Sequence, residues 1–128
     1  MAKGDIEGFE GELKKIFASI PYENYVKNNI SHFEGYYASV VYVYLASLGV
    51  PIVGEDVTNR GRIDMTLEFK DRVYIIEFKV GEGALDQIKE KRYWEKYEGR
   101  GKDITIVGID FDEGERNVKR VEWEKVKQ

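Results

Sequence analysis

Residues 62–80 read RIDMTLEFKDRVYIIEFKV and decide the fold, because two runs of strand-forming residues flank the turn-like pair Lys70-Asp71. Side chains alternate between the two faces of a strand. A hairpin centred on that pair has one wholly apolar face, and a one-residue slip would destroy it, so the register is well determined. The opposed pairs on the apolar face are Ile63–Phe78, Met65–Ile76 and Leu67–Tyr74.

The same register places Asp64 directly opposite Glu77, with Lys79 two residues further on the same face. Two opposed carboxylates destabilise a sheet, and a divalent cation would remove the conflict, because hard cations such as Mg²⁺ bind carboxylate oxygens. Lys79 could then hold an attacking water or neutralise developing charge. The alternative is that both acids are ordinary polar residues at the rim of the sheet, with Lys79 as their counter-ion.

The remaining elements are predicted from periodicity and breakers. Apolar residues recur at helical spacing over residues 5–19, before Pro21. Ser31 and Glu34 form a capping box for a helix to about Leu48, which is apolar around most of its circumference and is therefore expected to be covered on both sides. The other predictions are a strand at 51–58, a helix at 84–98, a buried parallel strand at 104–109 and an edge strand at 118–126.

This order, α-β-β-β-α-β-β, predicts an α/β domain with a mixed β-sheet of about five strands flanked by helices. We expect residues 1–128 to form a single domain, with residues 1–30 as an N-terminal helical segment packed on the core. Residues 35–54 carry no charge, which is nearly the length of a transmembrane helix. Their Tyr and Ser content, with Gly49 and Pro51, instead predicts a buried helix that runs into a strand.

The composition excludes several kinds of site. The chain has no Cys, so a disulfide scaffold and a thiolate zinc site are excluded, and a reducing cytoplasm is the expected compartment. His32 is the only His, which excludes a His-based triad. The formal net charge is −4, yet residues 60–102 hold 11 Lys and Arg against 9 Asp and Glu. That local excess gives weak support for an anionic partner, and charge balance taken alone favours a solvated charged surface.

The motifs in this order resemble the PD-(D/E)xK nuclease superfamily: a strand with Asp, a tight turn, a strand with Glu-x-Lys, and a Glu-bearing helix upstream. More narrowly, the segments GRIDMTLEFKDRVYIIEFKV, ALDQIKEKRYWEKY and DITIVGIDFD are similar to a nuclease-like domain often found C-terminal to an AAA-type ATPase-like domain in predicted prokaryotic ATPases. The resemblance covers nearly the whole chain. The sequence departs from the motif at Ile63, where the motif's name has Pro, a position that varies in the superfamily.

The resemblance implies a restriction-endonuclease-like core and a Mg²⁺ or Mn²⁺ cofactor. It implies Asp64 and Glu77 as metal ligands, completed by the main-chain carbonyl of Phe78, and Lys79 as the catalytic lysine. It also implies Glu34 as an auxiliary acid and Gln87 as a helix residue that reaches the site. The alternative for Glu34 is a purely capping role, and for Gln87 an ordinary position facing solvent.

Nucleic-acid contacts are expected around these residues. Basic residues are candidates for phosphate contacts, with a plain solvated surface as the alternative: Arg60, Arg62, Lys89, Lys91 and Arg92. Four aromatic residues could stack on bases, but such spacings more often indicate packing: Tyr37, Tyr93, Trp94 and Tyr97.

The expected function is metal-dependent hydrolysis of phosphodiester bonds in nucleic acid, with DNA as the expected substrate. The alternative is a catalytically silent nuclease fold that binds nucleic acid or docks to an AAA-type ATPase partner. The retained trio of Asp64, Glu77 and Lys79 favours the enzyme. No membrane partner is expected, and a homodimer is left open.

Overall fold

The computed structural model describes residues 6–20, 34–53 and 56–127. The first two helices, α1 (Ile6–Ala18) and α3 (Glu34–Ser47), lie where they were predicted. The proposed cap Ser31 lies outside the described residues. No helix within the described ranges is long and apolar enough to cross a membrane.

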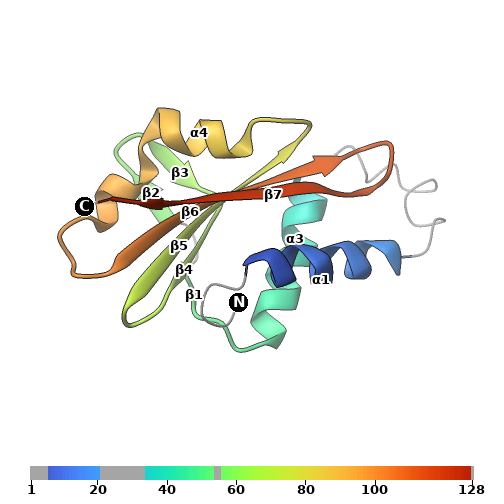
Figure 1. Ribbon diagram of the computed structural model, residues 1–128, viewed down its shortest axis with the longest axis horizontal. Coiled ribbons are helices and arrows are strands. Elements are labelled where there is room, and N and C mark those ends of the chain that lie inside the picture. Colours follow the sequence, from blue (N-terminus) through green and yellow to red (C-terminus); the bar gives the residue numbers. More distant parts are fainter. Residues whose placement is uncertain (1–5, 21–33, 54–55, 128) are drawn as a thin grey trace.

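A mixed sheet of five strands forms the centre of the fold, which confirms the predicted α/β class (Figure 1). The order is β1-β4-β5-β6-β7; the central pair β5–β6 is parallel and the other pairs are antiparallel. The predicted parallel strand is therefore β6, and the predicted edge strand is β7. The bounds are β1 (Ile52–Val53), β4 (Met65–Glu68), β5 (Arg72–Val80), β6 (Asp103–Asp112) and β7 (Asn117–Val126).

The prediction of one strand over residues 51–58 was wrong. Its first part is β1, at the edge of the main sheet, whereas its second part, β2 (Asp56–Thr58), pairs with β3 (Gly61–Ile63) in a separate antiparallel ribbon. Periodicity could not show this division, because both parts have strand-like composition and differ only in the strand with which they pair.

The prediction of one helix over residues 84–98 was also wrong. The α-helix α4 (Ala84–Lys91) ends at Arg92, which adopts a left-handed conformation with φ of 52°, and a 3₁₀ helix, η3 (Tyr93–Tyr97), follows. The Arg92 N–H still donates to the Ile88 carbonyl, at 2.8 Å, so the chain turns without losing this bond. The turn directs Tyr93 and Tyr97 into the core, where both are buried.

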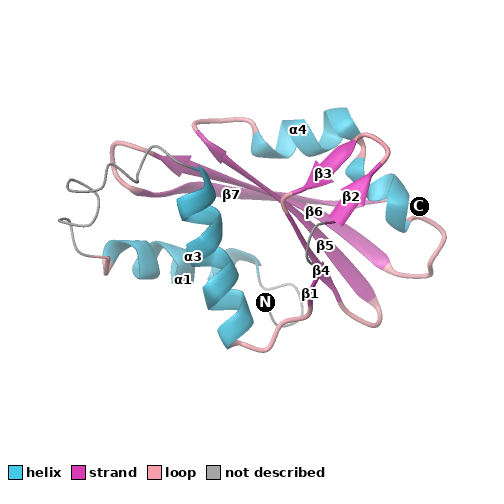
Figure 2. Cartoon of the chain, turned by 180° about the vertical axis from the view of Figure 1, so that it is seen from behind, coloured by secondary structure: helices cyan, strands magenta, loops and turns pink. Residues whose placement is uncertain are grey.

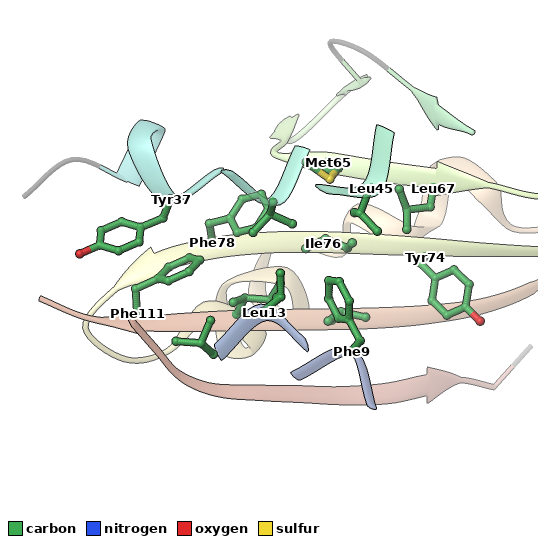
Figure 3. Packing of buried hydrophobic residues seen from close by; sticks show 14 of the residues in the cluster. Phe9, Leu13, Tyr37, Leu45, Met65, Leu67, Tyr74, Ile76, Phe78 and Phe111 are labelled. Carbon is green, nitrogen blue, oxygen red and sulfur yellow. The ribbon is translucent and has the colours of Figure 1, made fainter. Parts of the chain in front are cut away.

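Two apolar clusters cover the two faces of the sheet. Helices α1 and α3 pack on one face, where Tyr37, Leu45 and Ile76 are fully buried (Figure 3). Helix α4 and η3 cover the opposite face, as the view from behind shows (Figure 2). The second cluster consists of Ile63, Val73, Ile75, Leu85, Ile88, Tyr93, Tyr97, Ile104 and Ile106.

Helix α3 is not covered on both sides, contrary to the prediction. Its inner residues, such as Val41, are buried, but Tyr42 is 50% exposed and Val43 is 65% exposed. The sheet can bury only one side of the helix, so the apolar composition of the other side reflects something other than packing against the sheet.

Helix α4 lies unusually close to β6 because of Gly108. A Cβ atom built on Gly108 would lie 2.3 Å from the main-chain nitrogen of Leu85. Main-chain atoms cannot move aside as a flexible side chain can, so only glycine allows this approach. Since Gly108 lies beside Glu77 in the parallel register, the close approach also brings α4 over the polar part of β5.

We therefore predict that Gly108→Ala destabilises the protein by about 1–3 kcal/mol, the usual effect of overpacking. Urea unfolding followed by circular dichroism measures the change. Gly11→Ala is the matched control, because Gly11 lies in α1 with open space around it. This control should be neutral or stabilising by up to about 1 kcal/mol. Equal stability of the two variants would contradict the packing argument.

Candidate metal centre

Asp64 forms a bend between β3 and β4 rather than a position within a continuous strand. The predicted pairs Met65–Ile76 and Leu67–Tyr74 are confirmed. The predicted pair Ile63–Phe78 was wrong, because Ile63 pairs with Asp56 in the ribbon and packs on the opposite face, in the second cluster.

At the bend, each of the two candidate acids accepts a hydrogen bond from a main-chain N–H at or next to the other acid. The Asp64 N–H donates to Oε2 of Glu77 at 3.0 Å, and the Phe78 N–H donates to Oδ2 of Asp64 at 2.9 Å. Glu77 is 2% exposed, whereas Asp64 is exposed. Hydrogen bonds to ionised carboxylates are among the stronger ones, so this reciprocal pair fixes the separation and orientation of both groups.

The main chain of Phe78 is freed by the same bend. In an antiparallel pair, the N–H and C=O of one residue are directed to the same neighbouring strand. The ladder between β4 and β5 ends at Met65–Ile76, so Phe78, two residues beyond, has no strand partner on that side. Its N–H binds Asp64 instead, and strand geometry directs its carbonyl to the same side.

The structure brings Gln87 to this pair. Its Nε2 donates to Oε1 of Glu77 at 3.0 Å, and the side chain is half-buried at the inner side of α4. The two oxygens of Glu77 thus accept from two different elements, the bend at Asp64 and the helix α4. The position of α4, set by Gly108, therefore also sets the orientation of Glu77.

Tyr93, which the sequence suggested only as a packing residue or a candidate for stacking on bases, is a neighbour of the two acids. Its side chain is 4% exposed, and its hydroxyl lies 3.2 Å from a Cβ atom built on Gly61. Burial and the charges of Glu77 and Asp64 raise the pKa of Tyr93, although Gln87 lowers it somewhat. The phenol therefore stays protonated beside the carboxylates. Its position depends on the turn at Arg92, which gave no signal in the sequence.

Lys79 is half-buried at the end of β5. Its Nζ lies 4.0 Å from a Cβ atom built on Gly83, in the loop before α4. Within the described ranges, no ion pair within 4.0 Å joins Lys79 to Asp64 or Glu77. The interpretation of Lys79 as their counter-ion therefore has no contact to support it in this part of the chain. The side chain of Glu34, the first residue of α3, lies outside the described part, and its site role stays a prediction.

The basic candidates divide into two groups. Arg60 pairs with Glu95 at 3.1 Å, and Lys89 pairs with Glu124 at 2.5 Å. Three are exposed and make no ion pair with any residue that the structure describes: Arg62, Lys91 and Arg92. The packing interpretation is confirmed for the four aromatic residues. Tyr37, Tyr93 and Tyr97 are buried, and Trp94 packs against the second cluster.

The residues present fit a hard divalent cation. Two carboxylates and one carbonyl provide oxygen donors only, as Mg²⁺ prefers, and Mg²⁺ keeps several waters when it binds so few protein ligands. No cluster of three or more His, Cys, Asp or Glu that could hold a metal occurs among the described residues. A softer or His-preferring metal has no ligand set in that part of the chain.

A second buried carboxylate, Asp56, lies next to the bend. It is 1% exposed and accepts the Thr66 hydroxyl at 2.5 Å, the Tyr97 hydroxyl and the Lys96 ammonium. Burial alone would raise the pKa of Asp56, but these three hydrogen bonds and the charge of Lys96 outweigh it and hold the pKa below its usual range. Burial and the Asp56 carboxylate raise the pKa of Tyr97, so this phenol remains a donor. Asp56 is therefore ionised and fully bonded.

Comparison with known proteins agrees with this geometry. A family model described as the PD-(D/E)XK nuclease superfamily matches residues 32–121. A protein described as "Uncharacterized protein in vnfD 5'region", from Azotobacter chroococcum mcd 1, is 44% identical over 119 residues. That match covers 89% of this chain and 23% of the relative, so the chain spans about a quarter of the relative's length. No solved structure matches the chain.

The lowered pKa of Asp56 predicts a specific pH dependence. The stability that the ionised group contributes is fully present above the unfolded-state pKa, about 4. It is lost as the pH falls through the lower pKa of the folded state. The difference in free energy of unfolding between the wild type and Asp56→Asn should be constant from pH 7 to 5 and shrink below about pH 4.

Urea unfolding at each pH measures this difference. Asp71→Asn, at the exposed hairpin turn, is the control and should show little change at neutral pH. An Asp56→Asn effect that is the same at pH 3 as at pH 7 would show that the charge of Asp56 is not what stabilises the cluster.

Proposed function

Because this chain belongs to the PD-(D/E)XK nuclease superfamily, we propose that it hydrolyses phosphodiester bonds in nucleic acid, with DNA as the substrate. The observation that carries the proposal is the reciprocal hydrogen bonding of Asp64 and Glu77. Two carboxylates held at fixed positions, on the side of β5 where the Phe78 carbonyl has no β4 partner among the described residues, are suited to divalent-cation chemistry on phosphate.

In this proposal Asp64, Glu77 and the Phe78 carbonyl hold Mg²⁺ or Mn²⁺. A divalent cation bound there supplies positive charge for a phosphoryl oxygen and lowers the pKa of a coordinated water. Gln87 donates to Glu77 and keeps that carboxylate turned toward Asp64. Glu34 is proposed as an auxiliary acid from the start of α3.

Lys79 is proposed as the catalytic lysine. Its ammonium can hold the attacking water by donating a hydrogen bond to the water oxygen. It can also neutralise charge that develops on the phosphorane oxygens. It follows Glu77 by two residues in the same strand, so both groups lie on the same face of the sheet. This face is the one that α4 covers only in part.

Among the basic candidates, Arg62, Lys91 and Arg92 are the favoured phosphate contacts. Arg60 and Lys89 would have to exchange an existing carboxylate partner for a phosphate, which reduces the net gain. A Cβ atom built on Gly61 would lie 3.2 Å from the Tyr93 hydroxyl, so the chain segments that carry Arg62 and Arg92 approach each other at this point.

A second candidate function is supported by the length of the relative, because the matched region is only 23% of that protein. The domain could act within a larger assembly, such as one with an AAA-type ATPase, as a silent module that binds nucleic acid or docks to its partner. The exposed apolar residues of α3 and of the turn that follows it agree with such a contact: Tyr42, Val43 and Leu48.

The metal proposal predicts that Mn²⁺ and Mg²⁺ bind to the wild type and raise its thermal stability by mass action. Asp64→Asn should bind at least about tenfold more weakly, because the amide lacks the charge but still accepts from Phe78. Isothermal titration calorimetry measures the affinity. Asp71→Asn, at the far end of the hairpin, should bind like the wild type. Equal affinities of all three proteins would remove this site from consideration.

The catalytic proposal predicts that Lys79→Met leaves metal affinity intact, because an ammonium is no ligand, while cleavage falls by about a hundredfold or more. Met retains the apolar stem, so the packing of the side chain is preserved. The assay measures cleavage of supercoiled, linear and single-stranded DNA and of RNA, with Mg²⁺ and with Mn²⁺.

Asp64→Asn is the control for metal dependence in this assay and should abolish cleavage as well. Activity that survives both substitutions comes from a contaminating nuclease. A wild type that binds nucleic acid and metal but cleaves none of these substrates would favour the silent module.

A further inference from the structure

Asp56 bonds to the chain on both sides of the bend that contains Asp64. In the ribbon it is the strand partner of Ile63, the residue before Asp64. Its carboxylate accepts the hydroxyl of Thr66, two residues after Asp64, at 2.5 Å. One buried carboxylate therefore links the two strands, β3 and β4, that the bend separates.

The carboxylate is itself fixed by the 3₁₀ helix η3. Lys96 and Tyr97 both donate to it, and Lys96 also donates to the Val57 carbonyl at 3.1 Å. The other end of the ribbon contacts η3 through the ion pair of Arg60 with Glu95. The β2–β3 ribbon is thus fastened to η3 along its length, and the bend cannot straighten unless these contacts break.

A straightened chain would remove the candidate metal centre. If β3 and β4 formed one continuous strand, Ile63 would lie opposite Phe78, as the apolar pattern alone predicts. The main-chain groups of Phe78 would then pair with Ile63, so Asp64 would lose the Phe78 N–H and the carbonyl would no longer be available. The bend, rather than the hairpin register, is what assembles these ligands.

We propose that Asp56 is a positioning residue for the candidate metal centre. Through the Thr66 hydroxyl it holds the bend that places Asp64 beside Glu77 and frees the main chain of Phe78. The metal-related part of this inference rests on the proposed function, whereas the geometric part does not.

The location of Asp56 argues for this role over simple structural support. A buried ionised group is costly, and apolar residues of similar volume often stabilise a core equally well or better. Here the charge lies among hydrogen-bond donors from two elements, β4 and η3. The strand partner of Asp56 is Ile63, the residue next to Asp64. Directional bonds can hold a bend in one geometry, which apolar contacts do only weakly.

The test replaces Thr66, which is fully buried. Thr66→Val has nearly the same shape without the hydroxyl, and Thr66→Ser retains the hydroxyl. Amide hydrogen exchange is then measured at Asp64 and Phe78, whose N–H groups donate to the two carboxylates. We expect exchange at these two amides to become about tenfold faster in Thr66→Val, as for the loss of one buried hydrogen bond. It should return to the wild-type rate in Thr66→Ser.

Val41→Ala in α3 is the control for general loss of stability, because Val41 packs on the opposite face of the sheet. It should speed exchange throughout the core without singling out Asp64 and Phe78. If the acceleration in Thr66→Val is no greater at these two amides than in Val41→Ala, the positioning role is wrong. Asp56→Asn, analysed in the same way where it folds, should accelerate the same two amides.

Mn²⁺ titration separates this inference from the proposed function. If the wild type binds Mn²⁺, Thr66→Val should bind at least about tenfold more weakly and Thr66→Ser should bind normally. Unchanged affinity in Thr66→Val would overturn the positioning role. If no protein binds Mn²⁺ but the two amides still respond to Thr66→Val, the proposed function fails while the positioning role stands.

Discussion

The reciprocal hydrogen bonding between the Asp64 and Glu77 segments is the constraint on which the candidate site depends. Each carboxylate accepts a main-chain N–H from the neighbourhood of the other, at 3.0 and 2.9 Å. Because the donors belong to the backbone, the two groups cannot drift apart without unfolding the junction of β3, β4 and β5. This explains how a sheet tolerates two acids at close range: main-chain dipoles offset part of their repulsion, and the remaining negative field is what a cation would bind.

The layered architecture explains how the sheet accommodates a buried carboxylate at Glu77. Apolar clusters cover the sheet on both faces, so a carboxylate in the middle of β5 would normally be unfavourable. Gly108 lets α4 approach closely enough for Gln87 to donate to Glu77. The helix that buries the carboxylate therefore also provides one of its hydrogen bonds. Close packing and site geometry are consequences of the same glycine.

The alternation of apolar and polar residues along the strands was sufficient to predict most of the hairpin register. It failed where a tertiary contact overrides this alternation. The pairs Met65–Ile76 and Leu67–Tyr74 follow from the apolar face alone. Ile63 belongs to the same pattern, yet it lies on the other face, because Asp56 and η3 hold the bend. The polar neighbours Gln87 and Tyr93 differ likewise: the first follows from the resemblance, whereas the second depends on a left-handed Arg92 that periodicity cannot show.

Ion pairs distinguish the Lys and Arg residues that have a carboxylate partner from those that have none among the described residues. Lys96 is committed to buried Asp56, and Lys89 and Arg60 to surface carboxylates. Lys79 has no such ion pair in the part of the chain that the structure describes, although it lies half-buried in the same strand as Glu77. Placing an ammonium there has an energetic cost that a counter-ion would reduce. Under the proposed function, a phosphate held at the metal centre would be the partner of the Lys79 ammonium, which pairs with neither Asp64 nor Glu77 among the described residues.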